Sequence, residues 1–394
     1  MSRPHAGTLI IGGGLAGTRC ATTLRSLGYE HPITVIGDEP DMAYERPALS
    51  KQYLAGERTT DSLALQPAQT YQDLGIRFIT DDPVVAIDHH HRRVVTAAGD
   101  HHHYASLVMA SGAAARTLGG ESSWSNVGTL RTRADADHLR ASLRPGGQLV
   151  IVGCGFVGAE VASTASNMGV HVTVLEAGSA PFGALLGSEV GAVMLAHYRT
   201  SGITVHTDAM VTHLDGRNGL AHRVDLQDGS SYACDAVLVS IGSVPRDELY
   251  WSIDHAALGV RLPGGGIPVD PVGRTAVPDV YACGDVAAPW RAQEQTYRRI
   301  EHWTEAAAQG VAVAHTIAGC SAPAPPIPYV WSDQFGLRLQ YAGDGRGAAR
   351  VVMESAEPGQ LFVRYHDDAG RMMGVLGANR PRDIARLRQE LART

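Results

Sequence analysis

The sequence predicts an α/β protein with two Rossmann-like dinucleotide-binding domains and a C-terminal α+β domain. Three observations predict this class. They are the strand, glycine loop and helix of residues 8–28, the repetition of this pattern at residues 148–169, and a late strand, VYAC, that ends in Gly284-Asp285. With 394 residues, 44% hydrophobic and 19% charged, the chain is long enough for two or three domains with their own cores.

The first pattern begins with the apolar strand TLII and continues as Gly12-x-Gly14-x-x-Gly17, a helix, and a second strand, ITVIG. In such a motif the first glycine makes the tight turn, the second lets a pyrophosphate approach the backbone, and the third lets helix and strand pack closely. The helix N-terminus offers unpaired N–H groups to phosphates. Asp38 or Glu39, after the second strand, is expected to accept hydrogen bonds from ribose hydroxyls.

Residues 75–112 alternate like a small antiparallel meander and end on the buried strand SLVMASG. This region carries two histidine triplets, His89 to His91 and His101 to His103. Successive side chains of a strand face opposite ways, so a triplet cannot offer all its rings to one ion. We therefore expect a solvated hairpin face here and no functional metal site.

The second pattern repeats the first with Gly153, Gly155 and Gly158, followed by a helix and the strand HVTVLE, which closes on Glu176. No arginine follows Glu176 in AGSAPFGALLG to accept a 2′-phosphate, which favours NADH over NADPH. Two such units predict two dinucleotide sites, one with a permanently held cofactor and one with an exchanging one. The alternative is that one copy is only a structural relic.

The late strand VYAC places Asp285 just beyond its end, where a carboxylate can reach a sugar or ribityl hydroxyl. The alanine-rich run that follows, RRIEHWTEAAAQGVAVAHTIAG, predicts a helix that closes at Gly319. A helix N-terminus directed at a flavin would stabilise the negative charge that develops on reduction.

Composition excludes several classes of protein. No stretch reaches about 18 uncharged apolar residues, and the N-terminus lacks the apolar core of a signal peptide, so we expect neither a membrane span nor secretion. The cysteines are five, scattered, and without CxxC or CxxxxC spacing, which predicts reduced thiols in a cytoplasmic protein. A net charge of −7 argues against a nucleic-acid binder.

The segments GGGLAG, RPALSK, ASG, VYACGD and YVWSDQFGLRLQYAG, taken with the second glycine motif and Glu160, resemble the FAD-dependent ferredoxin reductases of bacterial oxygenase systems. These are the reductases of the putidaredoxin, rubredoxin and biphenyl dioxygenase types, within the glutathione-reductase superfamily. The resemblance runs from the first strand to the C-terminal ANRPRDIARLR and covers essentially the whole chain. The RPxLSK loop and the WSDQ segment are its more specific parts.

The resemblance implies that FAD lies along the first glycine motif and NADH along the second. It also implies that Lys51 and Glu160 are catalytic, with Lys51 near flavin N5 and facing Glu160. Lys51 is the only lysine of the chain, and lysine brings a compact point charge where arginine would bring a planar fork. The cofactor-binding residues that it implies are Gly12, Gly14, Leu15, Ala16, Gly17, Asp38, Glu39, Arg46, Lys51, Val84, Ala110, Gly112, Arg116, Gly153, Gly155, Phe156, Val157, Gly158, Glu160, Glu176, Ile241, Gly242, Gly284, Asp285, His302, Trp303 and Trp331.

Two departures from the family pattern stand out. Ala48 replaces a second proline that relatives commonly carry, and Glu305 replaces a common asparagine, which bears on the flavin edge or the docking surface. Simpler interpretations remain for three residues: Glu160 as a helix-terminal carboxylate, Arg46 as an ordinary loop arginine, and Trp331 as a core side chain.

The missing cysteine pair decides the expected electron transfer. Cys20 falls inside the first helix and Cys154 inside the second glycine loop, so a thiol relay to a flavin is not expected. We expect FAD to take a hydride from NADH and to pass single electrons to a [2Fe–2S] ferredoxin or rubredoxin that serves an oxygenase or cytochrome P450. The alternatives are an NADH-dependent flavoenzyme that reduces oxygen or a small molecule directly, and a redox-sensing flavoprotein of the apoptosis-inducing kind.

An arginine-rich C-terminal segment suggests where an acidic carrier docks. Residues 338–393 hold ten arginines against seven acids, and Arg298, Arg299 and Arg338 are candidates for the docking surface. The order of motifs predicts an FAD-binding domain at 1–110 and 245–320, an NAD-binding domain at 111–244 and a C-terminal domain at 321–394. We expect a monomer or homodimer that binds neither membrane nor nucleic acid.

Overall fold

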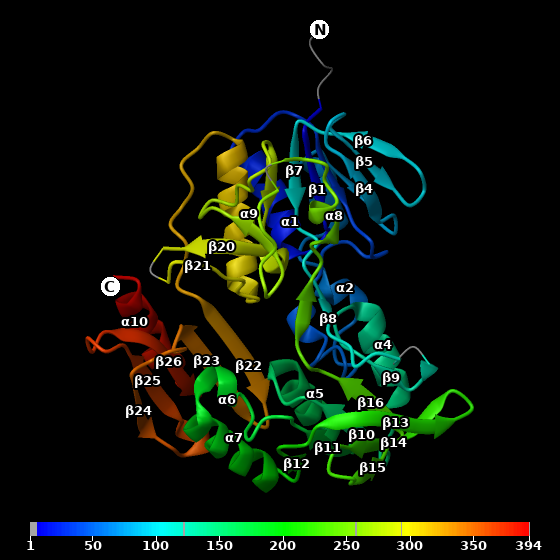
Figure 1. Ribbon diagram of the computed structural model, residues 1–394, viewed down its shortest axis with the longest axis vertical. Helices are drawn as coiled ribbons and strands as arrows, with labels where there is room; N and C mark the ends of the chain where they lie inside the picture. The colour runs from blue at the N-terminus through cyan, green and yellow to red at the C-terminus, as the bar shows by residue number, and fades with distance from the viewer. Residues whose placement is uncertain (1–5, 121–122, 257, 293, 394) are drawn as a thin grey trace. The chain divides into compact units, whose positions relative to one another are not determined.

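The computed structural model describes residues 6–120, 123–256, 258–292 and 294–393, which fold into two compact units (Figure 1). The first unit comprises Met1–Glu45, Ala64–Ala114 and Val244–Pro328, and the second comprises Arg46–Leu63, Ala115–Ser243 and Tyr329–Thr394. The RPALSK segment thus packs in the second unit, although it lies between two parts of the first in the sequence. The predicted division at residues 110, 244 and 320 stays a prediction, and the N-terminal residues without a signal-peptide pattern lie partly outside the described ranges.

The first unit is built on a parallel five-stranded sheet of order β19-β7-β1-β2-β3. The short runs are apolar and buried because helices cover both faces of a parallel sheet. Helices α1 and α9 lie side by side against it (Figure 1). The bounds are β1 Thr8–Ile11, α1 Leu15–Ser26, β2 Ile33–Ile36, β3 Ile76–Ile79, β7 Ser106–Met109, β19 Val280–Ala282 and α9 Trp303–Ile317.

Two small sheets complete the first unit, and the predicted meander is one of them. It has the order β4-β5-β6, and the second has the order β18-β20-β21. The bounds are α3 Ala68–Asp73, β4 Val84–Asp88, β5 Arg93–Thr96, β6 His101–His103, α8 Glu248–Trp251, β18 Ile267–Val269, η3 Gly284–Val286, β20 Ala287–Arg291 and β21 Thr296–Tyr297. The strand pair β8 Ala113–Ala115 and β17 Ser243–Pro245 stands where the chain passes from one unit to the other.

The second unit repeats the parallel arrangement in a sheet of order β12-β11-β10-β16-β9. A three-stranded antiparallel sheet, β13-β14-β15, accompanies it. The bounds are η1 Arg46–Ala48, α2 Thr60–Leu63, β9 Val127–Gly128, α4 Arg133–Ser142, β10 Gln148–Val152, α5 Phe156–Asn167, β11 His171–Leu175, α6 Gly183–Leu186, α7 Ser188–Thr200, β12 Thr204–His206, β13 Val211–Arg217, β14 Leu220–Leu226, β15 Ser231–Ala233 and β16 Ala236–Val239.

The C-terminal part of the second unit is an antiparallel sheet of order β22-β23-β26-β25-β24 with helix α10 packed on β26 and β23. Its bounds are β22 Tyr329–Gln334, β23 Leu337–Gly343, β24 Arg350–Ser355, η4 Pro358–Gln360, β25 Phe362–His366, β26 Met372–Ala378 and α10 Pro381–Leu391. One hydrophobic core joins this sheet to the parallel one, since Leu337 and Tyr365 belong to the same buried cluster as Leu149 and Tyr198. The predicted fold class is confirmed.

The histidine triplets lie in the small sheet of the first unit. His101 to His103 form β6, while the ring of His89, in the turn after β4, is hydrogen-bonded to the hydroxyl of Tyr104 at 3.0 Å. Among the residues that the structure describes, no three His, Cys, Asp or Glu side chains are placed to hold a metal ion. Within the same ranges, no helix combines the length and apolarity needed to cross a membrane.

Candidate functional site

The first glycine loop is shaped by positions that exclude a side chain. Gly12 has φ 115°, and a Cβ there would lie 2.1 Å from the carbonyl oxygen of Ala110. A Cβ on Gly17 would lie 2.2 Å from the Gly12 carbonyl, which is closer than any real contact. Gly14 precedes α1, and nothing lies within 4 Å of the place where its Cβ would be. The loop therefore leaves open backbone beside the helix N-terminus, as a pyrophosphate requires.

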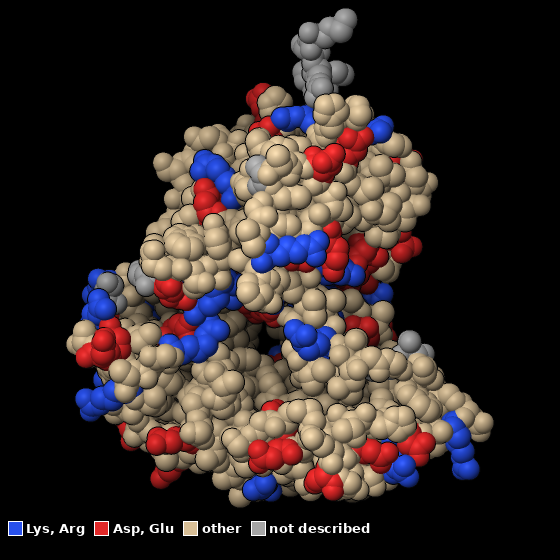
Figure 2. All heavy atoms as spheres, viewed as in Figure 1, with Lys and Arg blue, Asp and Glu red and all other residues tan. Residues whose placement is uncertain are grey.

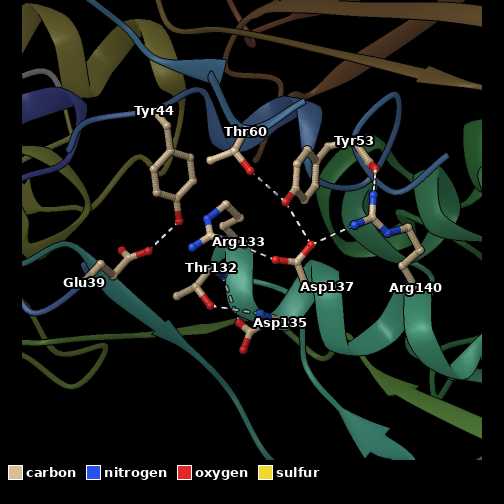
Figure 3. A network of polar contacts seen from close by, with 9 residues as sticks. All are labelled: Glu39, Tyr44, Tyr53, Thr60, Thr132, Arg133, Asp135, Asp137 and Arg140. Atoms are coloured by element: carbon tan, nitrogen blue, oxygen red, sulfur yellow. Dashed lines mark hydrogen bonds and ion pairs between the residues drawn. The ribbon is translucent and has the colours of Figure 1, made fainter. Parts of the chain in front are cut away.

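Acidic side chains lie at the carboxyl edge of the first sheet, beside this loop. Asp38, just after β2, is ion-paired with Arg246, and Glu39 accepts a hydrogen bond from the hydroxyl of Tyr44 at 2.5 Å (Figure 3). Asp285 follows β19 at the same edge, because β19, β7, β1 and β2 run parallel. No local sequence pattern predicted the pairing with Arg246, which lies more than 200 residues from Asp38.

The other candidates of the first unit surround the sheet edge and helix α9. Leu15 and Ala16 begin α1, and Ala110 and Gly112 follow β7. Gly284 follows β19, and its N–H donates a hydrogen bond to the side chain of Gln309 at 2.8 Å. His302 and Trp303 lie at the start of α9, and Val84 is a core residue of β4. Glu305 in the first turn of α9 is 3% exposed and pairs with Arg291 of β20 at 2.8 Å. The charge of Glu305, which stands where relatives commonly carry asparagine, is thus paired within the first unit.

The second glycine loop repeats the geometry of the first. Gly153 has φ 97°, a Cβ on it would lie 2.4 Å from the Ser240 carbonyl oxygen, and a Cβ on Gly158 would lie 2.3 Å from the Gly153 carbonyl. Gly155 precedes α5 with open space around its Cβ position. Of the two residues that start α5, Phe156 packs on Phe182, and Val157 is 38% exposed. The second loop also fits a dinucleotide.

Glu176 lies at the carboxyl end of β11 and is held by backbone amides. Its carboxylate accepts hydrogen bonds from the N–H groups of Cys154 and Gly178, both at 2.7 Å. Within the described ranges no cation is ion-paired with this carboxylate. Ile241 and Gly242 follow β16 at the same sheet edge, and Gly242 accepts a hydrogen bond from the N–H of Arg116 at 2.9 Å.

Lys51 and Glu160 form a buried ion pair. The Nζ of Lys51 lies 2.7 Å from Oε2 of Glu160, and the two side chains are 11% and 7% exposed. Ser50 donates a second hydrogen bond to Oε2 at 2.5 Å, and Ser332 donates one to Oε1 at 2.7 Å. All of these partners are side chains from outside α5, so Glu160 does not act as a cap of its own helix.

The segment that carries Lys51 is fixed to helix α4 (Figure 3). Tyr53 donates its hydroxyl proton to Asp137 at 2.8 Å, and Arg140 both pairs with Asp137 at 3.1 Å and donates to the Tyr53 carbonyl at 3.3 Å. Arg46 donates to the carbonyl of Arg131 at 2.8 Å. Residues 46–63 are therefore a structural part of the second unit, and Lys51 is positioned by that unit.

The family model described as pyridine nucleotide-disulphide oxidoreductase matches residues 7–310, which is most of the chain. This protein belongs to the pyridine nucleotide-disulphide oxidoreductase family. A second model, described as reductase C-terminal, matches residues 329–394. Within the family, the resemblance to ferredoxin reductases that the sequence predicted is confirmed by the relatives described next.

Similar members of the family span nearly the whole chain. The biphenyl dioxygenase system ferredoxin–NAD(+) reductase component of Paraburkholderia xenovorans is 36% identical over 95% of this chain and 91% of that protein. Rhodocoxin reductase of Rhodococcus erythropolis is 34% identical over 98% and 89%. Apoptosis-inducing factor 3 of Homo sapiens is 30% identical over 98% of this chain but only 62% of that protein.

A solved structure shows the same architecture. In the covalent complex of putidaredoxin reductase with putidaredoxin, a chain superposes with a TM-score of 0.93 and 28% identity, covering 99% of this chain and 93% of that one. The putidaredoxin complex shows that an architecture of this kind can hold a ferredoxin partner. The agreement includes the C-terminal sheet and α10, since almost all of the chain is covered.

Although the family is named for disulphide chemistry, the cysteines of this member do not form a redox pair. All five are free, and Cys320 alone among them is exposed. Burial raises the pKa of both Cys154 and Cys283 to about 12, so these thiols stay protonated and unreactive at neutral pH. These cysteines therefore offer no dithiol pair of the kind that a thiol relay requires.

The candidate docking arginines differ in how available they are. Arg298 and Arg299 are 21% and 15% exposed, and each is ion-paired with a glutamate. Arg338 is 56% exposed and lies 4.0 Å from Asp333. Figure 2 shows basic and acidic side chains interspersed on the viewed face, including the region of the C-terminal sheet and α10. Trp331, on β22, is half-buried and stacks on Tyr329.

Proposed function

We propose that this protein is an NADH-dependent FAD ferredoxin reductase. It would pass single electrons to a [2Fe–2S] ferredoxin or rubredoxin that serves an oxygenase or cytochrome P450. The observation that carries the proposal is the ion pair between Lys51 and Glu160, which lies on the helix after the second glycine loop, in a chain with no cysteine pair for a thiol relay. The near-full-length similarity to ferredoxin–NAD(+) reductases supports it.

The first unit would hold FAD. Gly12, Gly14 and Gly17 give the pyrophosphate access to the backbone and to the N-terminus of α1. Asp38 or Glu39 would accept ribose hydroxyls, and Asp285 a ribityl hydroxyl, because all three follow parallel strands at one sheet edge. When bound, FAD supplies the conversion of a two-electron hydride into single electrons.

The second unit would hold NADH. Gly153, Gly155 and Gly158 provide the pyrophosphate site, and Glu176, pre-oriented by two backbone N–H groups, would accept the ribose hydroxyls of the adenosine. A 2′-phosphate would bring negative charge next to this carboxylate, so NADH is the expected donor. We also propose a cytoplasmic location, because all five cysteines are free thiols, as is usual for proteins of a reducing compartment.

Lys51 would provide the positive charge beside the reacting ring. Its ammonium lies 2.7 Å from a carboxylate oxygen of helix α5, so the charge would already be in position when NADH binds. A fixed charge that is present before reaction stabilises developing negative charge without reorganisation.

Two other functions remain as test outcomes. A redox-sensing role like that of an apoptosis-inducing factor is less favoured, because this chain spans only 62% of that relative and about nine-tenths of the reductases. Direct reduction of oxygen or a small molecule would need no protein carrier.

The test is a carrier-dependence assay. The purified yellow protein is mixed with NADH, and cytochrome c reduction is followed with and without added [2Fe–2S] ferredoxin or rubredoxin. We expect at least about a tenfold faster rate with a carrier, and a much slower rate with NADPH in place of NADH. Equal rates with and without either carrier would exclude the reductase function and favour direct reduction of a small acceptor.

A further inference from the structure

A buried chain of hydrogen bonds connects the C-terminal sheet to Glu160. Ser332 and Gln334 on β22 are 0% and 2% exposed, and Tyr198 on α7 is 1% exposed. Tyr198 is hydrogen-bonded to Oε1 of Gln334, Nε2 of Gln334 donates to Ser332 Oγ at 2.9 Å, and Ser332 donates to Oε1 of Glu160 at 2.7 Å. This series of hydrogen bonds ends at the carboxylate of Glu160, which is ion-paired with Lys51.

In this series of hydrogen bonds, from Tyr198 to Glu160, the chemistry of each group determines which partner donates. An amide oxygen only accepts, so the hydroxyl of Tyr198 must donate to Gln334. Burial raises the pKa of Tyr198 well above its ordinary value, so the hydroxyl keeps its proton at any working pH. The amide nitrogen of Gln334 only donates, which leaves the hydroxyl proton of Ser332 for the carboxylate.

The two oxygens of Glu160 thus have separate partners. Oε2 receives Lys51 and Ser50, which come from the segment 46–63, and among the residues that the structure describes Oε1 receives only Ser332. Without Ser332, the carboxylate would be held on one oxygen only and could rotate about its last side-chain bond. Hydrogen bonds to a buried charged group are among the strongest in proteins, because the low dielectric surrounding strengthens them.

We propose that Ser332, oriented by Gln334 and Tyr198, is a positioning residue that fixes the Glu160 carboxylate and through it the ammonium of Lys51. The C-terminal part of the chain would then belong to the hydride-transfer site in addition to any role in docking. This inference deepens the proposed function and depends on it for its kinetic consequence. Its structural consequence, the position of one carboxylate, does not depend on it.

The protein offers a matched control at the same contact. Ser163 lies on α5 three residues after Glu160 and is 8% exposed. It accepts a hydrogen bond at 2.8 Å from the N–H of Phe335, the residue that follows β22. Ser163→Ala and Ser332→Ala each remove one buried hydroxyl between α5 and the β22–β23 region. Only Ser332→Ala removes a bond to Glu160, so the difference between the two variants isolates the positioning effect from general loosening.

The kinetic test measures flavin reduction by NADH in a stopped-flow instrument without any electron acceptor. We expect Ser332→Ala to lower the limiting rate about tenfold, equivalent to about 1.4 kcal/mol, with the apparent dissociation constant of NADH changed less than about twofold. Ser332→Thr, which keeps the hydroxyl, should restore most of the rate, and Ser163→Ala should leave it within about twofold of the native value. If Ser332→Ala does not fold, Tyr198→Phe removes the first donor and should slow reduction by about threefold.

A crystal structure of the Ser332→Ala variant gives the second readout, which requires no activity. We expect the carboxylate of Glu160 to be turned and its oxygen to lie farther than 2.7 Å from Lys51 Nζ. An unmoved carboxylate, or a rate loss in Ser332→Ala no larger than in Ser163→Ala, would overturn the proposal. If NADH does not reduce the wild-type flavin, the proposed function fails, and the crystal structure alone decides the positioning claim.

Discussion

The two glycine loops have nearly the same backbone and lead into helices with different chemistry. Gly14 has φ −77° and ψ −169° before α1, and Gly155 has φ −79° and ψ −172° before α5. The fifth residue of α1 is Arg19, which is exposed, whereas the fifth residue of α5 is Glu160, which is buried. The equivalent position of the two helices therefore carries an exposed cation in α1 and a buried, paired carboxylate in α5.

The neighbours of each helix explain this difference. Helix α9 lies so close to α1 that a Cβ on Gly310 would meet the carbonyl oxygen of Ala16 at 2.3 Å, which leaves Arg19 at the edge of the contact. Helix α5 is instead covered by β22 and by residues 46–63, which bring Ser332 and Lys51 to Glu160. A burial cost that would be large for an isolated carboxylate is offset by three donors. We propose on this basis that the first loop holds the cofactor and that the second loop also takes part in its reduction.

The largest expected effect comes from replacing the third glycine of each loop by alanine, which should impair a different cofactor in each case. A Cβ would clash equally in Gly17→Ala and Gly158→Ala, at 2.2 and 2.3 Å from a carbonyl oxygen. Gly17→Ala should be purified without flavin. Gly158→Ala should keep its flavin but show an apparent KM for NADH raised about 30-fold, or about 2 kcal/mol. Visible absorbance and steady-state kinetics measure both, and loss of flavin from both variants alike would contradict separate roles.

The next effect compares the acids that follow the two second strands. Glu176 is oriented by two backbone N–H groups, whereas Glu39 is bound by the hydroxyl of Tyr44. We expect Glu176→Ala to reduce the ratio of kcat/KM for NADH over NADPH by about tenfold, because it removes the ribose acceptor and the repulsion of a 2′-phosphate. Glu39→Ala is the control, and a change of the ratio in that variant would contradict the assignment.

The smallest effect concerns the cysteines. Cys320 is the one exposed thiol among five, and the raised pKa of Cys154 and Cys283, at about 12, keeps both in the unreactive protonated form. Iodoacetamide at mildly alkaline pH should therefore modify a single thiol of the native protein, found at Cys320 by peptide mass mapping, and leave ferredoxin reduction unchanged. Unfolded protein, in which all five thiols react, is the control. Loss of activity in step with labelling would indicate a thiol in the electron path.

Local patterns in the sequence were sufficient for the fold class and both loops. The spacing of Gly12, Gly14 and Gly17 encodes a turn and a helix start within a few residues, so it can be read without knowing distant contacts. The pairing of Lys51 with Glu160 was predicted only through the resemblance, since the two lie 109 residues apart.

Contacts between remote segments could not be predicted in this way. Ser50 and Ser332 are ordinary serines by any local rule, and their importance comes from burial beside Glu160. Arg246 reaches Asp38 across 208 residues, and the docking candidate Arg299 is ion-paired with Glu301 rather than freely exposed. Such pairings depend on how the chain closes each unit, and no short pattern carries that information.

The central claim is that the ion pair between Lys51 and Glu160 of α5 controls reduction of the flavin, and Lys51→Ala tests it most directly. Stopped-flow mixing with NADH should show the limiting rate of flavin reduction lowered about 100-fold, or about 2.7 kcal/mol, with flavin content unchanged. Arg19→Ala, at the corresponding fifth position of α1, should reduce at the native rate. An unchanged rate in Lys51→Ala, or an equal loss in both variants, would contradict the account.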